Sequence, residues 1–149
     1  MTSPNHQPRM RIVIIDDSRF ARRLIQQILE HSGEFEVVGQ AADGEEGLER
    51  IHELQPDFIT LDWNMPRLGG LDILRHLRGE NQVPVIIVTS LPPRLEDIIR
   101  ETQTRQVVGI VNKTFSAQSI DLSVFSDELL TTARQAAHRA RECRSETGL

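Results

Sequence analysis

Short runs of β-branched and other apolar residues alternate with helical stretches along most of the chain, and this alternation limits the fold more than any other feature. Nearly every residue in these runs is apolar, as expected of strands that are buried on both faces. The runs cover residues 11–15, 36–41, 58–61, 85–89 and 107–111. Strands that alternate with helices predict an α/β domain in which a parallel sheet is covered on both faces.

The segments between the runs carry apolar residues at the spacing of one helix face. This spacing continues through a last, long segment whose C-terminal part is polar except for alanines. The residues concerned are Ala21, Leu24, Ile25, Ile28 and Leu29, then Leu48 and Ile51, then Leu71, Leu74 and Leu77, then Leu95, Ile98 and Ile99, then Leu122, Phe125, Leu129, Ala133, Ala136 and Ala140. We therefore predict a (βα)5 order and a doubly wound, five-stranded sheet, which binds ligands beyond the C-terminal ends of its strands.

The length of 149 residues allows one domain with a single core and no second domain of similar size. We predict that this domain covers residues 10–141. Residues 1–9 are polar and are predicted to form a disordered tail. Residues 142–149 are predicted to be a polar tail or the start of a linker.

Charge and hydropathy limit which partners the protein can bind and where in the cell it can be located. A net charge of −5 opposes direct binding to nucleic acid, because phosphate contacts need clustered Lys and Arg. No apolar run approaches the roughly 20 residues of a membrane helix, and the N-terminus has no signal-peptide pattern. The single cysteine, Cys143, agrees with a reducing compartment. We therefore expect a cytoplasmic protein without membrane contact.

Polar residues follow four of the five predicted strands. Asp16 and Asp17 follow the first, Asp62 the third, and Lys113 the fifth, while Thr89 ends the fourth. Three carboxylates at one edge repel one another unless a hard cation such as Mg²⁺ lies among them. A metal, a Lys and a hydroxyl beside one carboxylate are the groups that phosphoryl transfer onto that carboxylate needs. Asp62 follows the central strand and is the expected acceptor.

Four segments in this order resemble the response-regulator receiver family of two-component signalling. They are Ile-Ile-Asp-Asp-Ser at 14–18, Leu-Asp-Trp-Asn-Met-Pro at 61–66, Val-Thr-Ser at 88–90 and Asn-Lys at 112–113. The resemblance covers roughly residues 10 to 141. Within the family, several segments are similar to chemotaxis regulators, both the receiver of the methylesterase regulator and the single-domain motor regulator. The resemblance implies a flavodoxin-like receiver fold.

The resemblance also assigns the metal site. It makes Asp62 the phosphoacceptor, and it makes Asp17 and the backbone carbonyl of Asn64 direct ligands of Mg²⁺, for which Mn²⁺ can substitute. Asp16 becomes a further ligand or holds a metal-bound water. These assignments agree with the chemistry that the strand ends predict from the residues alone.

The same resemblance implies how the protein signals. Lys113 pairs with the phosphoryl oxygens, and the Thr89 hydroxyl moves towards them. A sensor histidine kinase or a phosphotransfer protein supplies the phosphoryl group, and a downstream protein target reads the altered surface. Such a receiver catalyses its own phosphorylation and dephosphorylation but is primarily a signalling switch and not an enzyme.

Two positions around the lysine depart from the family pattern. The family usually has a proline after the lysine, in a cis peptide bond, and an aromatic residue three positions before it, whereas this chain has Thr114 and Ile110. A cis bond without proline costs about 3 kcal/mol, so we predict a trans bond between Lys113 and Thr114. Because Ile110 has no ring to move, we expect the signalling surface around residues 95–101.

Two alternatives remain at this stage. A haloacid-dehalogenase-like phosphatase also uses an aspartate nucleophile and Mg²⁺, but it needs both aspartates after the first strand, and here Asn64 follows Asp62 on the third. A pseudo-receiver would be a constitutive interaction module. The complete set of acidic, hydroxyl and lysine residues argues against it.

Overall fold

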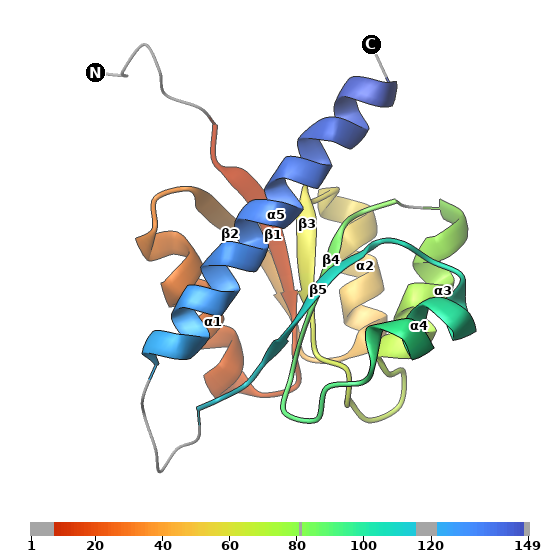
Figure 1. The fold of residues 1–149 in the computed structure, drawn as a ribbon, viewed down its shortest axis with the longest axis horizontal. Helices are drawn as coiled ribbons and strands as arrows, with labels where there is room; N and C mark the ends of the chain where they lie inside the picture. The colour runs from red at the N-terminus through yellow and green to blue at the C-terminus, as the bar shows by residue number, and fades with distance from the viewer. Residues whose placement is uncertain (1–7, 81, 116–121, 148–149) are drawn as a thin grey trace.

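The computed structural model describes residues 8–80, 82–115 and 122–147 and contains one sheet of five parallel strands (Figure 1). In chain order the strands are β1 (Met10–Ile15), β2 (Phe35–Ala41), β3 (Phe58–Leu61), β4 (Val85–Thr89) and β5 (Val107–Asn112). Their order in the sheet is β2-β1-β3-β4-β5, with β3 in the centre. The predicted fold class is confirmed, and the observed strand ends differ from the predicted ones by at most one residue.

Five helices connect and follow the strands: α1 (Arg19–His31), α2 (Gly44–Leu54), α3 (Gly70–Glu80), α4 (Leu95–Thr102) and α5 (Ser123–Thr147). Side chains cap two of them, because Ser18 Oγ accepts from Ala21 N at 3.2 Å and Asp43 Oδ1 accepts from Glu46 N at 2.9 Å. After α1, Gly33 turns the chain with a φ of +81°, a conformation that glycine adopts without strain.

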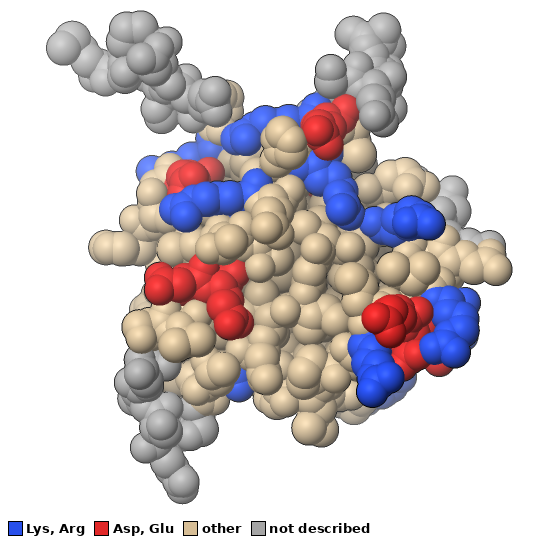
Figure 2. Space-filling model, in the orientation of Figure 1, with Lys and Arg blue, Asp and Glu red and all other residues tan. Residues whose placement is uncertain are grey.

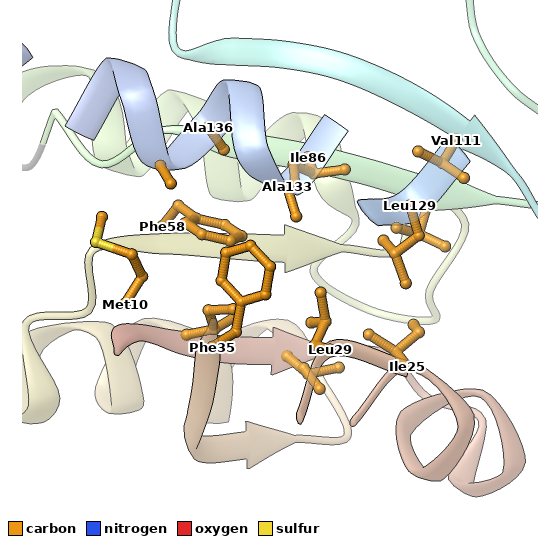
Figure 3. Packing of buried hydrophobic residues seen from close by; sticks show 14 of the residues in the cluster. Met10, Ile25, Leu29, Phe35, Phe58, Ile86, Val111, Leu129, Ala133 and Ala136 are labelled. Carbon is orange, nitrogen blue, oxygen red and sulfur yellow. The ribbon is translucent and has the colours of Figure 1, made fainter. Parts of the chain in front are cut away.

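Two hydrophobic clusters lie on opposite faces of the sheet. One cluster joins β1, β3 and β4 to α1 and α5, and the small side chains Ala133 and Ala136 let α5 approach the sheet closely (Figure 3). Phe35 and Phe58 meet edge to face within it, with ring centroids 5.7 Å apart. The second cluster lies under α2, α3 and α4. Strands β3 and β4 are therefore buried along their whole length, as the apolar runs predict.

Helix α5 continues past residue 141, where we placed the domain boundary, and its last turns extend beyond the sheet (Figure 1). The predicted N-terminal tail lies mostly in residues 1–7, outside the described residues. In the part of the chain that the structure describes, no helix is long and apolar enough to cross a membrane.

Basic side chains gather at the end of the molecule where the strands begin (Figure 2). Arg134 forms an ion pair with Glu34, just before β2, and Arg139 donates to the carbonyl of Arg105, just before β5. The middle of the same face is nearly free of charge. Within the described residues, an acidic cluster with two buried members and one exposed member lies at the opposite end, where the strands finish.

Candidate phosphorylation site

The parallel strands deliver the predicted polar residues to one edge. Ile15 pairs with Leu61 in the sheet, so Asp16 and Asp62 follow the ends of neighbouring strands, and the Asp62 amide donates to the Ile15 carbonyl at 2.9 Å. Thr89 ends β4, and its carbonyl accepts from the Lys113 amide at 2.9 Å. The backbone hydrogen bonds of the sheet therefore fix the backbone positions of these residues independently of their side-chain contacts.

Asp16, Asp17 and Asp62 form a cluster in which one carboxylate oxygen of each lies within 4.8 Å of the others. Asp16 and Asp62 are buried and Asp17 is exposed. Asp16 Oδ1 accepts from the Ser18 amide at 2.9 Å, which fixes the orientation of this carboxylate. The three acidic residues that the sequence placed at this edge are thus together.

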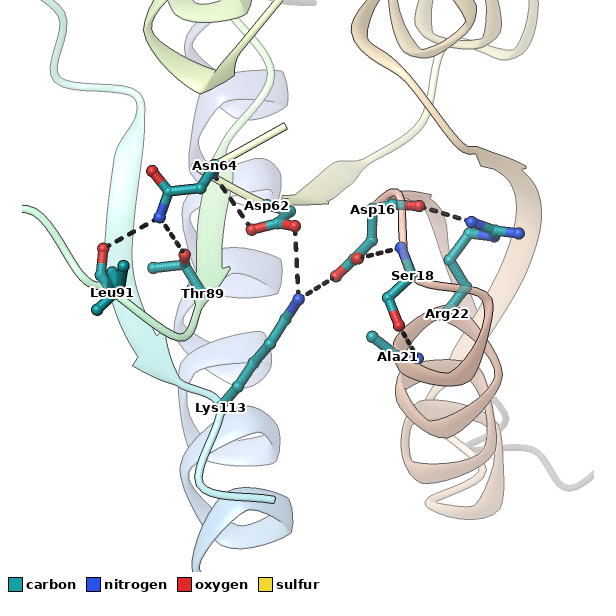
Figure 4. Close-up of polar contacts among 9 residues, drawn as sticks. All are labelled: Asp16, Ser18, Ala21, Arg22, Asp62, Asn64, Thr89, Leu91 and Lys113. Atoms are coloured by element: carbon teal, nitrogen blue, oxygen red, sulfur yellow. Dashed lines mark hydrogen bonds and ion pairs between the residues drawn. The ribbon is translucent and has the colours of Figure 1, made fainter. Parts of the chain in front are cut away.

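The Lys113 ammonium lies between the two buried carboxylates (Figure 4). Its Nζ is 2.8 Å from Asp16 Oδ2 and 3.5 Å from Asp62 Oδ2, and its side chain is only 10% exposed. A buried ammonium needs such partners, because an unpaired charge away from water costs several kcal/mol. The Lys113–Thr114 bond is trans, as predicted, since the described residues contain no cis peptide bond.

The environment of Asp62 makes its charged form less favourable than that of a free carboxyl. Burial, and then the neighbouring Asp16 carboxylate, raise the pKa of Asp62 from 3.8 to about 6, although Lys113 and the Asn64 amide act in the opposite direction. One lysine therefore does not neutralise the cluster. A further positive charge at this position would lower the pKa of Asp62 again and stabilise its nucleophilic carboxylate.

The donor atoms suit a hard divalent cation. All three clustered side chains offer carboxylate oxygens, the ligand type that Mg²⁺ prefers. Asp16 Oδ2 accepts no hydrogen bond from the described residues and has only its ion pair with Lys113, so it retains capacity for a metal or a metal-bound water. Asp17 is open to solvent, which leaves room for the waters that Mg²⁺ usually keeps.

Asn64 and Thr89 lie on the other side of Asp62. The Asn64 amide donates to Asp62 Oδ1 at 3.4 Å, while its side-chain Nδ2 donates to Thr89 Oγ1 at 3.3 Å and to the Leu91 carbonyl at 3.4 Å (Figure 4). Asn64 is therefore bonded to the end of β4 and to the loop that follows it.

Sequence reasoning missed two features of the site. Arg22 donates from a guanidinium nitrogen to the Asp16 carbonyl at 2.7 Å, which braces the loop that carries Asp16 and Asp17. No sequence signal marks this contact, because Arg22 is one of several arginines in α1. The second feature is that Lys113 is the only lysine in the chain, which a count of the residues in the sequence shows.

Comparisons with known proteins agree with this geometry. Residues 12–125 match the model of the response regulator receiver domain, and the chain belongs to that family. It is a receiver domain of the kind that acts as a phosphorylation-activated switch in two-component signalling.

Among solved structures, the chain resembles the response regulator domain of Thermotoga maritima CheB, with a TM-score of 0.77 and 33% identity. The match covers 88% of this chain and 98% of that one. Among curated relatives, a protein-glutamate methylesterase/protein-glutamine glutaminase from Pyrococcus horikoshii is 33% identical over 129 residues. A protein of the same name from Lawsonia intracellularis is 37% identical over 133 residues.

The shared segment is a minor part of these relatives. It covers 87% of this chain but 35% of the Pyrococcus protein, and 88% of this chain but 37% of the Lawsonia protein. The chain thus spans about a third of the length of the curated relatives that it matches. What these comparisons establish for this chain is the receiver family and its fold.

Proposed function

We propose that Asp62 accepts a phosphoryl group from a phosphohistidine of a sensor kinase or phosphotransfer protein, and that Asp16, Asp17, Asp62 and the carbonyl of Asn64 hold Mg²⁺. The observation that carries the proposal is the meeting of Asp62, Asp16 and Lys113 in one buried cluster at the C-terminal edge of the sheet. Structural carboxylates are seldom buried beside one another, because each raises the energy of the other's charged form.

The chemistry is an in-line displacement. An Asp62 carboxylate oxygen attacks phosphorus, and the bond from phosphorus to the donor nitrogen breaks. The histidine leaves with the electron pair of that bond, and it departs neutral or takes a proton from solvent. The product is an acyl phosphate on Asp62. When bound, the divalent metal neutralises charge on the carboxylates and on the phosphoryl oxygens.

The protein's own groups position the transfer. The Lys113 ammonium, now shared between Asp16 and Asp62, becomes a partner for a phosphoryl oxygen. The Thr89 hydroxyl lies near the acceptor through Asn64 and is the small donor that moves towards the new oxygens. This movement changes the loop after β4, so we propose α4 (Leu95–Thr102) as the surface that a downstream protein target reads.

The test is phosphorylation by acetyl phosphate with Mg²⁺ or with a chelator, followed by borohydride reduction. Hydride converts an aspartyl phosphate into homoserine and releases phosphate. We expect homoserine at position 62, found by peptide mass spectrometry, only when Mg²⁺ is present. Homoserine at position 16 or 17, or incorporation that is equal in chelator, would refute the assignment.

A further inference from the structure

Among the described residues, the sheet anchors the backbone at Lys113 on its N-terminal side. The Lys113 amide donates to the Thr89 carbonyl, which is the last contact of the β4–β5 ladder. The next residue, Thr114, is exposed and lacks the fixed φ angle that a proline would supply. A second anchor is needed after Lys113 to hold a flexible four-methylene side chain between two buried carboxylates.

Phe115 supplies a contact at the required place. Its ring centroid lies 4.7 Å from that of Phe125, at an interplanar angle of 68°, and 5.8 Å from that of Phe20, at 55°. Phe125 is fully buried in the core under α5, whereas Phe20, in the first turn of α1, is half exposed. We name Phe20, Phe115 and Phe125 the aromatic clasp.

The clasp joins three separate parts of the chain. Phe20 belongs to the helix that begins just after Asp16 and Asp17, Phe115 to the loop that carries Lys113, and Phe125 to α5. Contact between Phe20 and Phe115 therefore ties the loop of the acidic residues to the loop of the lysine. Both loops must keep their spacing for Lys113 Nζ to remain near Asp16 and Asp62.

We propose that Phe115, acting through the aromatic clasp, is a positioning residue that holds Lys113 at the phosphorylation site. This inference rests on the proposed function for its role in phosphoryl transfer, but the placement of Lys113 can be tested without any transfer. The ring confines the backbone two residues after Lys113, while the ladder bond confines it directly, so the ammonium does not have to be held by its ion pairs alone.

The first experiment uses the fact that Lys113 is the only lysine in the chain. Amine-reactive trinitrobenzenesulfonate labels its side chain, and mass spectrometry gives the rate at that one residue. We expect Phe115→Ala to be labelled several-fold faster than the wild type, Phe20→Ala to show a smaller increase, and Phe115→Leu to recover most of the protection. Val124→Ala, which removes a half-exposed side chain outside the clasp, serves as the matched control.

Equal labelling rates in wild type and Phe115→Ala would overturn the proposal. An equal rise in Val124→Ala would do the same, because it would show general loosening of this region. Circular dichroism of each variant confirms that the comparison is made between folded proteins. Phe20→Ala and Phe115→Leu keep the test decisive should Phe115→Ala fail to fold.

The second experiment asks whether Phe115 acts through Lys113. We expect Phe115→Ala to slow phosphorylation by acetyl phosphate, by up to roughly 100-fold, since a misplacement of about 1 Å can have an effect of this size. In a Lys113→Ala background the same substitution should cause no further loss. Additive losses would overturn the proposal, whereas a wild type that takes up no phosphoryl group would refute the proposed function and leave the labelling result standing.

Discussion

Strand β3 is flanked by two buried aspartates whose carboxylates have different neighbours. Asp57, just before the strand, is 6% exposed, and its Oδ2 accepts from the Arg11 amide at 2.7 Å, while its own amide donates to the Arg11 carbonyl. Asp62, just after the strand, is 5% exposed and faces another carboxylate and an ammonium. Burial is equal, so burial alone does not mark the functional residue.

The difference lies in what each carboxylate meets. A backbone amide beside Asp57 stabilises its charge and ties β1 to the start of β3. The Asp16 carboxylate beside Asp62 has the opposite effect on charge, which makes the metal-free site energetically unfavourable. We therefore infer that Asp57 serves folding and Asp62 serves chemistry.

The largest difference should appear in phosphorylation. Asp62→Asn should take up no phosphoryl group from acetyl phosphate and Mg²⁺, because an amide is not a nucleophile, whereas Asp57→Asn should be labelled at close to the wild-type rate. Intact-mass spectrometry over a time course measures both. Loss of labelling in Asp57→Asn, with its fold intact, would break the contrast, as would undiminished labelling of Asp62→Asn.

The second largest effect should be on Mg²⁺ affinity, which should differ among alanine variants of the acidic residues. Asp17→Ala should weaken Mg²⁺ binding by roughly 10- to 100-fold and Asp16→Ala by less, because we expect Asp17 to bind the metal directly and Asp16 partly through a water. Asp57→Ala should bind Mg²⁺ as the wild type does. Fluorescence of Trp63, the residue after Asp62, reports the titration. The reverse order for Asp16 and Asp17 would contradict the ligand assignment.

Stability should change in opposite directions at the two ends of the strand. Asp57→Ala leaves the Arg11 amide without this acceptor and should lower the free energy of unfolding by about 1.5–3 kcal/mol. Asp62→Asn, in chelator at pH 7.5, should raise it by about 1–3 kcal/mol, because it removes the cost of ionising a carboxyl whose pKa is raised to about 6. Urea denaturation measures both effects.

The stabilisation by Asp62→Asn should depend on pH with a defined sign. Between pH 6 and 3.8 the folded wild type binds a proton at Asp62 that the unfolded chain binds more weakly. The wild type therefore gains stability relative to the variant as pH falls through 6, and the advantage of Asp62→Asn disappears towards pH 4. A difference that stays constant from pH 7.5 to 4 would show that the raised pKa is not its cause.

The smallest effect concerns the lifetime of the phosphorylated form. Leu91 is 75% exposed and apolar, so it cannot orient a water for attack on the acyl phosphate. Leu91→Glu should speed hydrolysis by roughly two- to tenfold, less than the roughly 10²–10⁴ of a well-placed general base. Decay of the label after removal of the phosphodonor measures this, and equal rates would exclude a role for this position.

The fold and the acidic cluster could be predicted because both follow from short-range patterns. Apolar runs specify which segments are buried, and the ends of parallel strands share an edge, so Asp16, Asp62 and Lys113 were bound to meet once the strands were placed. Contacts such as that from Arg22 to the Asp16 carbonyl could not be predicted, since they depend on loop conformation and on the rotamers of long side chains. The aromatic clasp is of the same kind.

The Asn64 side chain donates a hydrogen bond to the Thr89 hydroxyl, and under the proposed function this bond limits the output of the unphosphorylated protein. In the proposed switch Thr89 moves towards the phosphoryl group. This hydrogen bond must then break, and the free energy of breaking it opposes activation. A typical net hydrogen bond of about 0.5–1.5 kcal/mol shifts a two-state equilibrium roughly two- to tenfold. Loss of the Asn64 side-chain amide would therefore raise both the background output and the sensitivity to a weak stimulus.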